Sequence, residues 1–276
     1  MGTSSSYGGP QIGLIPSWVD DPATGVAAPE GTAVDPAAAP RQPPRTSPDL
    51  SGAGSLRGAR IAFNQFARTG NRDALARGMS RYVRDGVGGS GRAARRMGEA
   101  RATAGRLLGV VRDFSRDGPA EALRRVDLAG LAGQPAEDVL LSLLEVICPP
   151  GGSLDEAIAR QGMLEAIDAL AEEGLGAFDE LTAGHLEEFF LDVVARTIEA
   201  RILNDIGAKG VSIPDDIGAI NRLQAQLHDF VGGTVRGELA GRLSGVASLS
   251  DRAVAGAANG VYEAAFEMLA ILGDDL

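Results

Sequence analysis

Residues 217–239 read IGAINRLQAQLHDFVGGTVRGEL, and this stretch decides the fold. Its large apolar residues recur at intervals of three and four positions and form one stripe: Ile217, Ile220, Leu223, Leu227, Val231, Val235 and Leu239. Side chains with this spacing share one face of an α-helix, whereas a half-buried strand alternates at every second residue. The stretch therefore predicts a long amphipathic helix that follows Pro214.

Similar stripes on both sides of this stretch extend the helical pattern. Before it, one stripe predicts a helix that runs towards residue 207: Leu186, Phe190, Val193 and Val194. After it, another stripe predicts the last helix: Val254, Val261, Met268 and Leu272. The apolar run 137–148 stops before two prolines, after which Ser153 and Glu156 have the spacing of a capping box. No stretch shows a convincing strand alternation or a βαβ pattern. The expected fold is all-α, a multi-helix bundle.

The segment that precedes residue 126 also predicts helices. Residues 55–66 and 71–83 suit helices, and Asn71 can cap the second one because its side-chain oxygen accepts hydrogen bonds from free backbone amides. The glycine-rich stretch 86–91 predicts a flexible break. Residues 92–114 then predict one continuous helix, which ends at the Gly-Pro pair 118–119.

Residues 1–52 predict a long disordered tail. Nine of the fourteen prolines fall there, and few large apolar residues remain to be buried. One exception is IGLIPSW, residues 12–18, which contains the only tryptophan of the chain. Such a patch is either a docking motif for a partner or a segment that packs on its own domain, and the sequence leaves both open.

Charge divides the rest of the chain into two segments. Residues 41–125 hold eighteen arginines against seven acidic residues, whereas residues 126–276 hold eight basic residues against twenty-six acidic ones. We expect 53–125 to be a basic helical segment and 126–276 an acidic helical bundle, with 53–276 forming one domain. The chain has a single cysteine, which fits a reducing cytoplasm, and its N-terminus does not resemble a leader. No apolar run approaches the roughly 18 residues of a membrane span. We therefore expect a cytoplasmic protein without membrane contact.

No catalytic motif emerges from the remaining polar residues. The stretch 86–91 has no lysine for a phosphate-binding loop. His185 and His228 are expected to be surface or capping residues, and Cys148, at the end of an apolar helix, to be structural. Adjacent carboxylates point about 100° apart on a helix and are expected to be solvated: Glu172 and Glu173, Glu187 and Glu188, Asp215 and Asp216, Asp274 and Asp275. The sequence predicts no enzyme activity, no metal site and no cofactor.

Five arginines of the basic segment suggest an alternative function. Arg92, Arg95, Arg96, Arg101 and Arg106 could contact the phosphates of a nucleic acid. No nucleic-acid-binding motif accompanies them, and the C-terminal segment is acidic. Pairing with acidic groups of the chain or of a partner is therefore favoured, and nucleic acid is not an expected partner.

Four stretches carry a resemblance to a known family. They are MGTSSSYGGP (1–10), GLIPSWVDDP (13–22), ARIAFNQFARTGNRDALARGMSRYVRDGVGGSGRAARRMG (59–98) and LLSLLEVICPPGGSLDEAIAR (140–160). As a set they resemble the QatB family, the B components of Qat anti-phage defence systems, over nearly the whole chain. None of them is a catalytic signature. The resemblance implies a four-part system that also contains an ATPase, a QueC-like enzyme and a TatD-like nuclease.

The resemblance also implies a role for the N-terminus. QueC-type enzymes activate the carboxylate of 7-carboxy-7-deazaguanine with ATP, and a free amine can intercept the activated acyl group. Removal of Met1 would expose the α-amine of Gly2, whose pKa of about 8 leaves a neutral fraction at pH 7. Gly2 is thus the predicted modification site. The predicted partner contacts are Tyr7, Leu14, Ile15 and Trp18.

These expectations combine into one functional prediction. The chain is predicted to be a non-enzymatic scaffold or adaptor in phage defence that binds a QueC-like (QatC-type) enzyme. The ATPase and the TatD-like nuclease are further possible partners. A nucleic-acid-binding subunit that uses the Arg-rich segment is the alternative.

Overall fold

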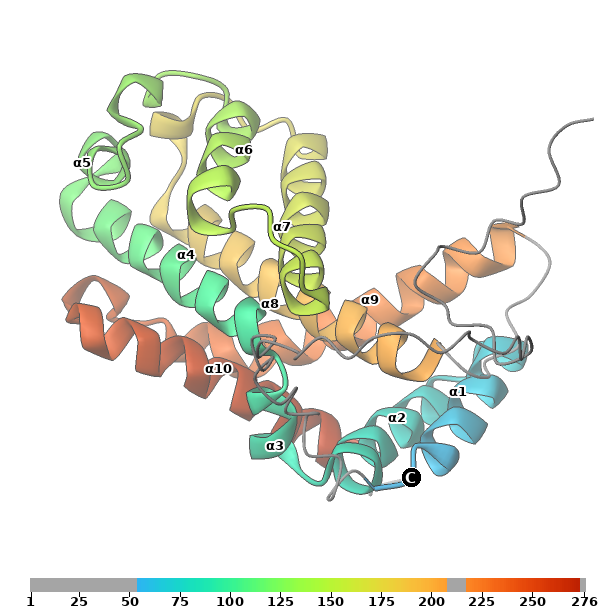
Figure 1. Ribbon diagram of the computed structural model, residues 1–276. Helices are drawn as coiled ribbons and strands as arrows, with labels where there is room; N and C mark the ends of the chain where they lie inside the picture. Colours follow the sequence, from blue (N-terminus) through green and yellow to red (C-terminus); the bar gives the residue numbers. More distant parts are fainter. Residues whose placement is uncertain (1–53, 208–216, 274–276) are drawn as a thin grey trace, which may run out of the picture. The chain divides into compact units, whose positions relative to one another are not determined.

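The computed structural model describes residues 54–207 and 217–273, which belong to one compact unit (Figure 1). These residues contain ten α-helices and no β-strand, so the all-α prediction is confirmed. The helices are α1 (Arg57–Thr69), α2 (Arg72–Arg81), α3 (Ser90–Arg95), α4 (Gly98–Asp117), α5 (Pro119–Arg124), α6 (Ala136–Ile147), α7 (Leu154–Glu172), α8 (Ala183–Gly207), α9 (Ile217–Leu239) and α10 (Asp251–Ile271). A π-helical turn, Tyr82–Val87, follows α2. The predicted tail, 1–52, lies outside the described residues.

Helices α8 and α4 form the centre of this unit. α8 packs against α7, α9 and α4, while α4 also packs against α5, α7 and α10 (Figure 1). Tyr262 of α10 is fully buried between the two, with its hydroxyl oxygen 2.7 Å from Oγ1 of Thr197 in α8 and 3.4 Å from the carbonyl oxygen of Ala100 in α4. Buried apolar residues of the basic and acidic segments form one continuous cluster. The charge asymmetry of the chain therefore does not divide the core.

Local sequence sets several helix boundaries as predicted. The side chain of Asn71 accepts two hydrogen bonds from backbone amides of the first turn of α2. Ser153 and Glu156 form the capping box at the start of α7. α4 ends at Gly118, where a φ of 86° favours glycine, and α8 extends to residue 207. These boundaries are confirmed because each depends on residues within one helical turn.

The prediction of one helix over residues 92–114 is wrong. α3 and α4 are separate helices, and Gly98, with a φ of 41°, begins the second one. The guanidinium of Arg201 in α8 donates a hydrogen bond of 2.5 Å to the carbonyl oxygen of Arg96, and it pairs with Asp155 at 2.7 Å. In a continuous helix this carbonyl oxygen would accept a backbone hydrogen bond, but here it accepts one from a side chain 105 positions away. A tertiary contact overrides the local pattern.

The break predicted at residues 86–91 is present but shorter, at Gly88 and Gly89. Gly86 is buried within the π-helical turn, and a Cβ at that position would collide with the side chain of Leu56. Helical geometry stops only at Gly88 and Gly89, whose φ angles are 85° and 103°. Glycine at position 86 therefore permits close packing, and the change of backbone geometry lies two residues further on.

The apolar stripe of α9 is buried only in its second half. Leu227, Val231, Val235 and Leu239 are buried, as the stripe predicts. Ile217, at the start of the helix, is 74% exposed, and Ile220 and Leu223 are partly exposed. The first two turns of α9 therefore leave apolar side chains open to solvent.

A short antiparallel contact closes the α6–α7 hairpin at its base. The amide of Ala136 donates to the carbonyl of Gly176 at 3.1 Å, and the amide of Phe178 donates to the carbonyl of Gln134 at 2.9 Å. The ring of Phe178 is buried and meets Phe114 of α4 edge-on, with 5.5 Å between the ring centroids. The contact thereby fastens the hairpin to α4.

Candidate functional site

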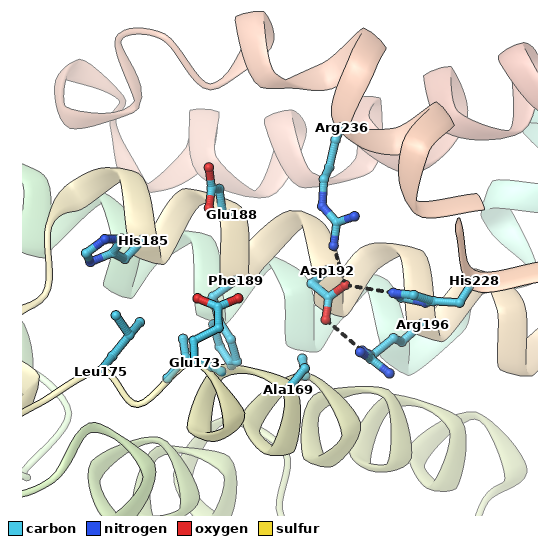
Figure 2. Close-up of a pocket in the computed structure, with 12 residues that line it drawn as sticks. Ala169, Glu173, Leu175, His185, Glu188, Phe189, Asp192, Arg196, His228 and Arg236 are labelled. Carbon is cyan, nitrogen blue, oxygen red and sulfur yellow. Dashed lines mark hydrogen bonds and ion pairs between the residues drawn. The ribbon is translucent and has the colours of Figure 1, made fainter. Parts of the chain in front are cut away.

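Asp192 of α8 lies at the centre of three basic side chains (Figure 2). Its carboxylate accepts hydrogen bonds from Arg196 at 2.6 Å and from Arg236 at 2.8 Å, and Nε2 of His228 lies 3.4 Å away. Burial alone would raise the pKa of the Asp192 carboxyl, but the hydrogen bonds from His228 and Arg196 outweigh burial and hold this pKa below its usual range. The carboxylate is therefore ionised at neutral pH and joins α8 to α9.

His228 is a protonated member of this cluster. Its Nε2 faces Asp192, and its Nδ1 lies 3.2 Å from Oε2 of Glu199. Hydrogen bonds to these two carboxylates raise the pKa of His228 to about 9, although partial burial opposes the shift. The expectation of a surface or capping histidine is therefore wrong for His228, because the half-buried ring of this α9 residue pairs with two carboxylates of α8. An imidazolium has no free lone pair and can neither accept a proton nor bind a metal ion.

The cluster forms one side of a cavity of about 330 Å³ between α7, α8 and α9 (Figure 2). Ala169 of α7 and Phe189 of α8 contribute apolar side chains to the cavity wall. Glu173 and Glu188 also line the cavity, are exposed, and form no ion pair with another described residue. These carboxylates are solvated as predicted, but they face a shared cavity as well as bulk water.

The charges of this cavity are fixed at neutral pH. Asp192 is ionised, Arg196 and Arg236 are permanent cations, and His228 is protonated. General acid–base catalysis is most effective when a group titrates near the working pH, whereas binding by charge needs no titration. Carboxylates outnumber cations among the lining residues when the neighbouring Glu165 and Glu199 are included. The arrangement therefore favours the binding of a cationic group.

A second buried carboxylate, Asp113 of α4, has a similar set of neighbours. Arg112 lies 2.7 Å from it, Arg125 2.8 Å and Arg116 3.3 Å. Burial would raise the pKa of Asp113, but hydrogen bonds from Arg112 and Arg125 dominate and lower it. Arg112 also pairs with Asp251, the first residue of α10. This cluster connects α4 with the end of α5 and the start of α10.

His185 and Cys148 agree with the sequence predictions. The amide of Thr182 donates to Nδ1 of His185, and the amide of His185 donates to Oγ1 of Thr182, both at 3.2 Å, so His185 helps to cap α8. Cys148 is buried at the end of α6. Within the described ranges, no three potential metal ligands gather at one place. None of the described helices is long and apolar enough to cross a membrane.

Two of the five arginines singled out in the basic segment form ion pairs within the chain. Arg96 pairs with Asp205 of α8 at 3.2 Å, and Arg106 pairs with a glutamate of its own helix. The prediction that these arginines pair with acidic groups of the chain is confirmed for Arg96 and Arg106. Arg92 and Arg95 are exposed on α3.

The residues predicted as modification and partner sites lie outside the described residues: Gly2, Tyr7, Leu14, Ile15 and Trp18. The acidic pairs 215–216 and 274–275 also lie outside them. The structure instead brings together Asp192, Arg196, His228 and Arg236, which the sequence does not single out as a site. The i,i+4 spacing of Asp192 and Arg196 is a local signal, but the partner from α9 is 44 positions away.

The fold and the cavity together define an all-α protein that presents fixed charges beside an apolar wall. A family model described as "Qat anti-phage system associated protein QatB" matches residues 88–269, more than half of the chain. The chain therefore belongs to the QatB family and is a component of an anti-phage defence system. No curated protein and no solved structure matches it.

Proposed function

We propose that this chain is a non-enzymatic scaffold or adaptor of a bacterial Qat system, which binds the QueC-like enzyme of that system and accepts a modification at Gly2. Membership of the QatB family carries the proposal, because the family is described as associated with an anti-phage system. The ATPase and the TatD-like nuclease are further proposed partners.

The geometry of the described residues supports a binding role. The charges around Asp192 are fixed by mutual ion pairs, so they can position a charged group but are poorly suited to move a proton near pH 7. One continuous core holds α1 to α10 together and gives these charges a rigid frame. Gly2 lies 55 residues before Arg57 in the sequence and belongs to none of the described helices.

The proposed modification is an amide bond to the N-terminal nitrogen. The neutral α-amine of Gly2 attacks the acyl carbon of an acyl-adenylate made by the QueC-like enzyme from ATP and a carboxylate. AMP leaves, and the nitrogen loses one proton. Roughly a tenth of an α-amine with a pKa of about 8 is neutral at pH 7, and glycine places no Cβ beside the nucleophile.

Co-expression with the QueC-like enzyme tests both parts of the proposal. We expect the two proteins to co-purify, and intact-mass and peptide analysis to show added mass on the N-terminal peptide. Gly2→Glu should retain Met1 and lose the added mass, whereas Gly2→Ala, which still permits removal of Met1, should keep it. An unmodified N-terminal peptide from the wild-type complex would remove the acceptor role, and failure to co-purify would remove the adaptor role.

Nucleic-acid binding is the second candidate, and the exposure of Arg92 and Arg95 on α3 favours it. The net charge of −11 opposes it, so we expect only weak binding of duplex DNA at physiological salt. Sub-micromolar binding in a fluorescence titration would promote this candidate, provided that Arg92→Ala with Arg95→Ala abolishes it. Arg68→Ala with Arg72→Ala, at exposed positions of α1 and α2, is the matched control.

A further inference from the structure

Three hollows adjoin along one side of α8 and form what we call the α8 groove. The first is the cavity of Figure 2, of about 330 Å³. The second, of about 370 Å³, shares Arg196 and His228 with the first, and the third, of about 280 Å³, shares Leu203 and Gln224 with the second. Residues of α8 and α9 line all three, together with α7 along the first two and α1 along the third.

The groove has the length of a short helix. Its lining residues on α8 recur every three or four positions: Glu188, Asp192, Arg196, Glu199, Leu203 and Ile206. Glu188 and Ile206 are eighteen residues apart, which at 1.5 Å per residue corresponds to about 27 Å, or five helical turns. The hollows thus follow one face of α8 between its neighbours over a distance that suits helix-in-groove recognition.

The end of the groove near α1 is apolar. Its lining is almost entirely aliphatic and aromatic: Phe63, Phe66, Ala67, Leu203, Ile206, Ile220, Leu223 and Leu227. Leu203 is 41% exposed, and Ile217, one turn before Ile220 on α9, is 74% exposed. Apolar side chains gathered in one hollow and left partly exposed are typical of a surface that a partner covers.

The other end of the groove carries an excess of negative charge. The three cations there all contact Asp192; Arg196 also lies 3.7 Å from Glu165, and His228 also contacts Glu199. These cations are therefore already engaged by carboxylates of the groove. Glu173 and Glu188 remain exposed and have no ion-pair partner within the described residues. A basic side chain of a partner would complement them.

We propose that the α8 groove binds an amphipathic helix of a partner protein. Bulky apolar residues of that helix would lie between α1, α8 and α9, and lysine or arginine residues would face Glu173 and Glu188. The inference rests on the proposed function, because it names the surface and the chemistry by which an adaptor would hold a partner. The apolar anchors supply most of the affinity, and the charges set the direction of the bound helix.

A designed peptide tests the groove without knowledge of the partner. The probe is a fluorescent helical peptide of about 18 residues with leucines along one half and lysines on the same face of the other half, made in both sequence orders. We expect one order to bind the purified full chain, and replacement of its lysines by glutamates to weaken binding roughly ten-fold. Equal binding of lysine and glutamate peptides, or no binding of either order, overturns the proposal.

Matched variants locate the binding site. Leu203→Asp at the apolar end should weaken binding of the lysine peptide roughly ten-fold, and Glu173→Arg at the charged end about five-fold. The controls are Val146→Asp, at a 46% exposed position of α6, and Glu172→Arg, at the exposed residue beside Glu173 that does not line the groove. Circular dichroism checks that all four variants fold. Equal losses in test and control variants contradict the proposed site.

Co-expression with the QueC-like enzyme separates this inference from the proposed function. If the wild-type complex forms and Leu203→Asp and Glu173→Arg do not weaken it, the groove is not the docking site and the adaptor role stands. If no protein of the system binds but the peptide occupies the groove, the adaptor role fails and the groove stands. Dimerisation of the chain alone that Leu203→Asp abolishes assigns the groove to a second copy and overturns our assignment.

Discussion

Asp113 and Asp192 are both buried carboxylates with three basic neighbours, yet the two clusters differ in what those neighbours can do. Around Asp113 all three are arginines, which stay protonated at any pH at which the protein folds. Around Asp192 one of the three is His228, whose pKa of about 9 lies within experimental reach. The same arrangement of charge is therefore permanent on α4 and dependent on pH on α8. The α8 cluster also borders an open cavity.

The largest expected effect is the loss of the central carboxylate of the arginine cluster. Asp113→Ala takes from Arg112, only 8% exposed, the buried one of its two carboxylate partners and leaves it only the exposed Asp251, and a poorly compensated buried charge is costly. We expect a loss of about 3 kcal/mol in the free energy of unfolding, measured by urea denaturation. Asp117→Ala, at a more exposed carboxylate of the same cluster, is the control and should cost less than about 1 kcal/mol. Equal losses would show that burial does not set the cost.

The second effect separates the clusters by pH. The folded-state pKa of His228 is raised from 6.5 to about 9, so its contribution to stability is complete below pH 6.5 and is lost as the pH rises through 9. We expect wild-type protein to lose on the order of 2 kcal/mol over this range, against little loss in His228→Gln. Asp192 and Glu199 raise this pKa, and Arg196 opposes them. The same slope in wild-type and His228→Gln would refute the assignment.

The third effect compares the packing around two glycines, one near each cluster. At Gly162 of α7, beneath the α8 cluster, an added Cβ would lie 2.6 Å from the methyl carbon of Thr197. Gly162→Ala should therefore destabilise the protein by about 1–2 kcal/mol, as a core overpacked by one methyl group. Gly109 of α4 has open space around a Cβ, so Gly109→Ala should stabilise by about 0.5–1 kcal/mol. Thermal unfolding should give shifts of opposite sign, and a shared sign would contradict the packing.

The smallest effects concern the outermost members of each cluster. Asp251 is 94% exposed where it meets Arg112, and Arg236 is 48% exposed where it meets Asp192. Exposed ion pairs contribute little, so Asp251→Ala and Arg236→Ala should each cost about 0.5 kcal/mol in urea denaturation. A loss near that of Asp113→Ala would mean that the periphery, and not the buried carboxylate, holds the cluster together.

Sequence reasoning succeeds where the determinant is local. The cap of α2 at Asn71, the capping box of α7 and the end of α4 each depend on residues within about one turn, and all can be read from the chain. The gap between α3 and α4 has no such signal. It depends on Arg201, which reaches the carbonyl of Arg96 across 105 positions.

The candidate site fails to emerge from the sequence for the same reason. The pattern places Asp192 and Arg196 on one helix face, but no spacing rule brings His228 and Arg236 of α9 to them. The spacing of apolar residues likewise predicts the apolar stripe of α9, but it does not show which half of the stripe other helices bury. Only packing against α8 reveals that the turns around Ile220 line an open groove.

The contact at the base of the α6–α7 hairpin has a consequence for the topology of the chain. Because Ala136 and Gly176 are hydrogen-bonded, the two ends of a segment of about forty residues meet at one point and close a loop, whose helices α6 and α7 pack on α4 and α8. The closure entropy of such a loop rises slowly with its length, by about 0.6 kcal/mol for each doubling. The tip, residues 149–152, is exposed and lines none of the hollows of the α8 groove. Added residues there would lengthen the loop without rerouting the chain through α4 and α8, which makes the tip a natural point for insertion of a reporter.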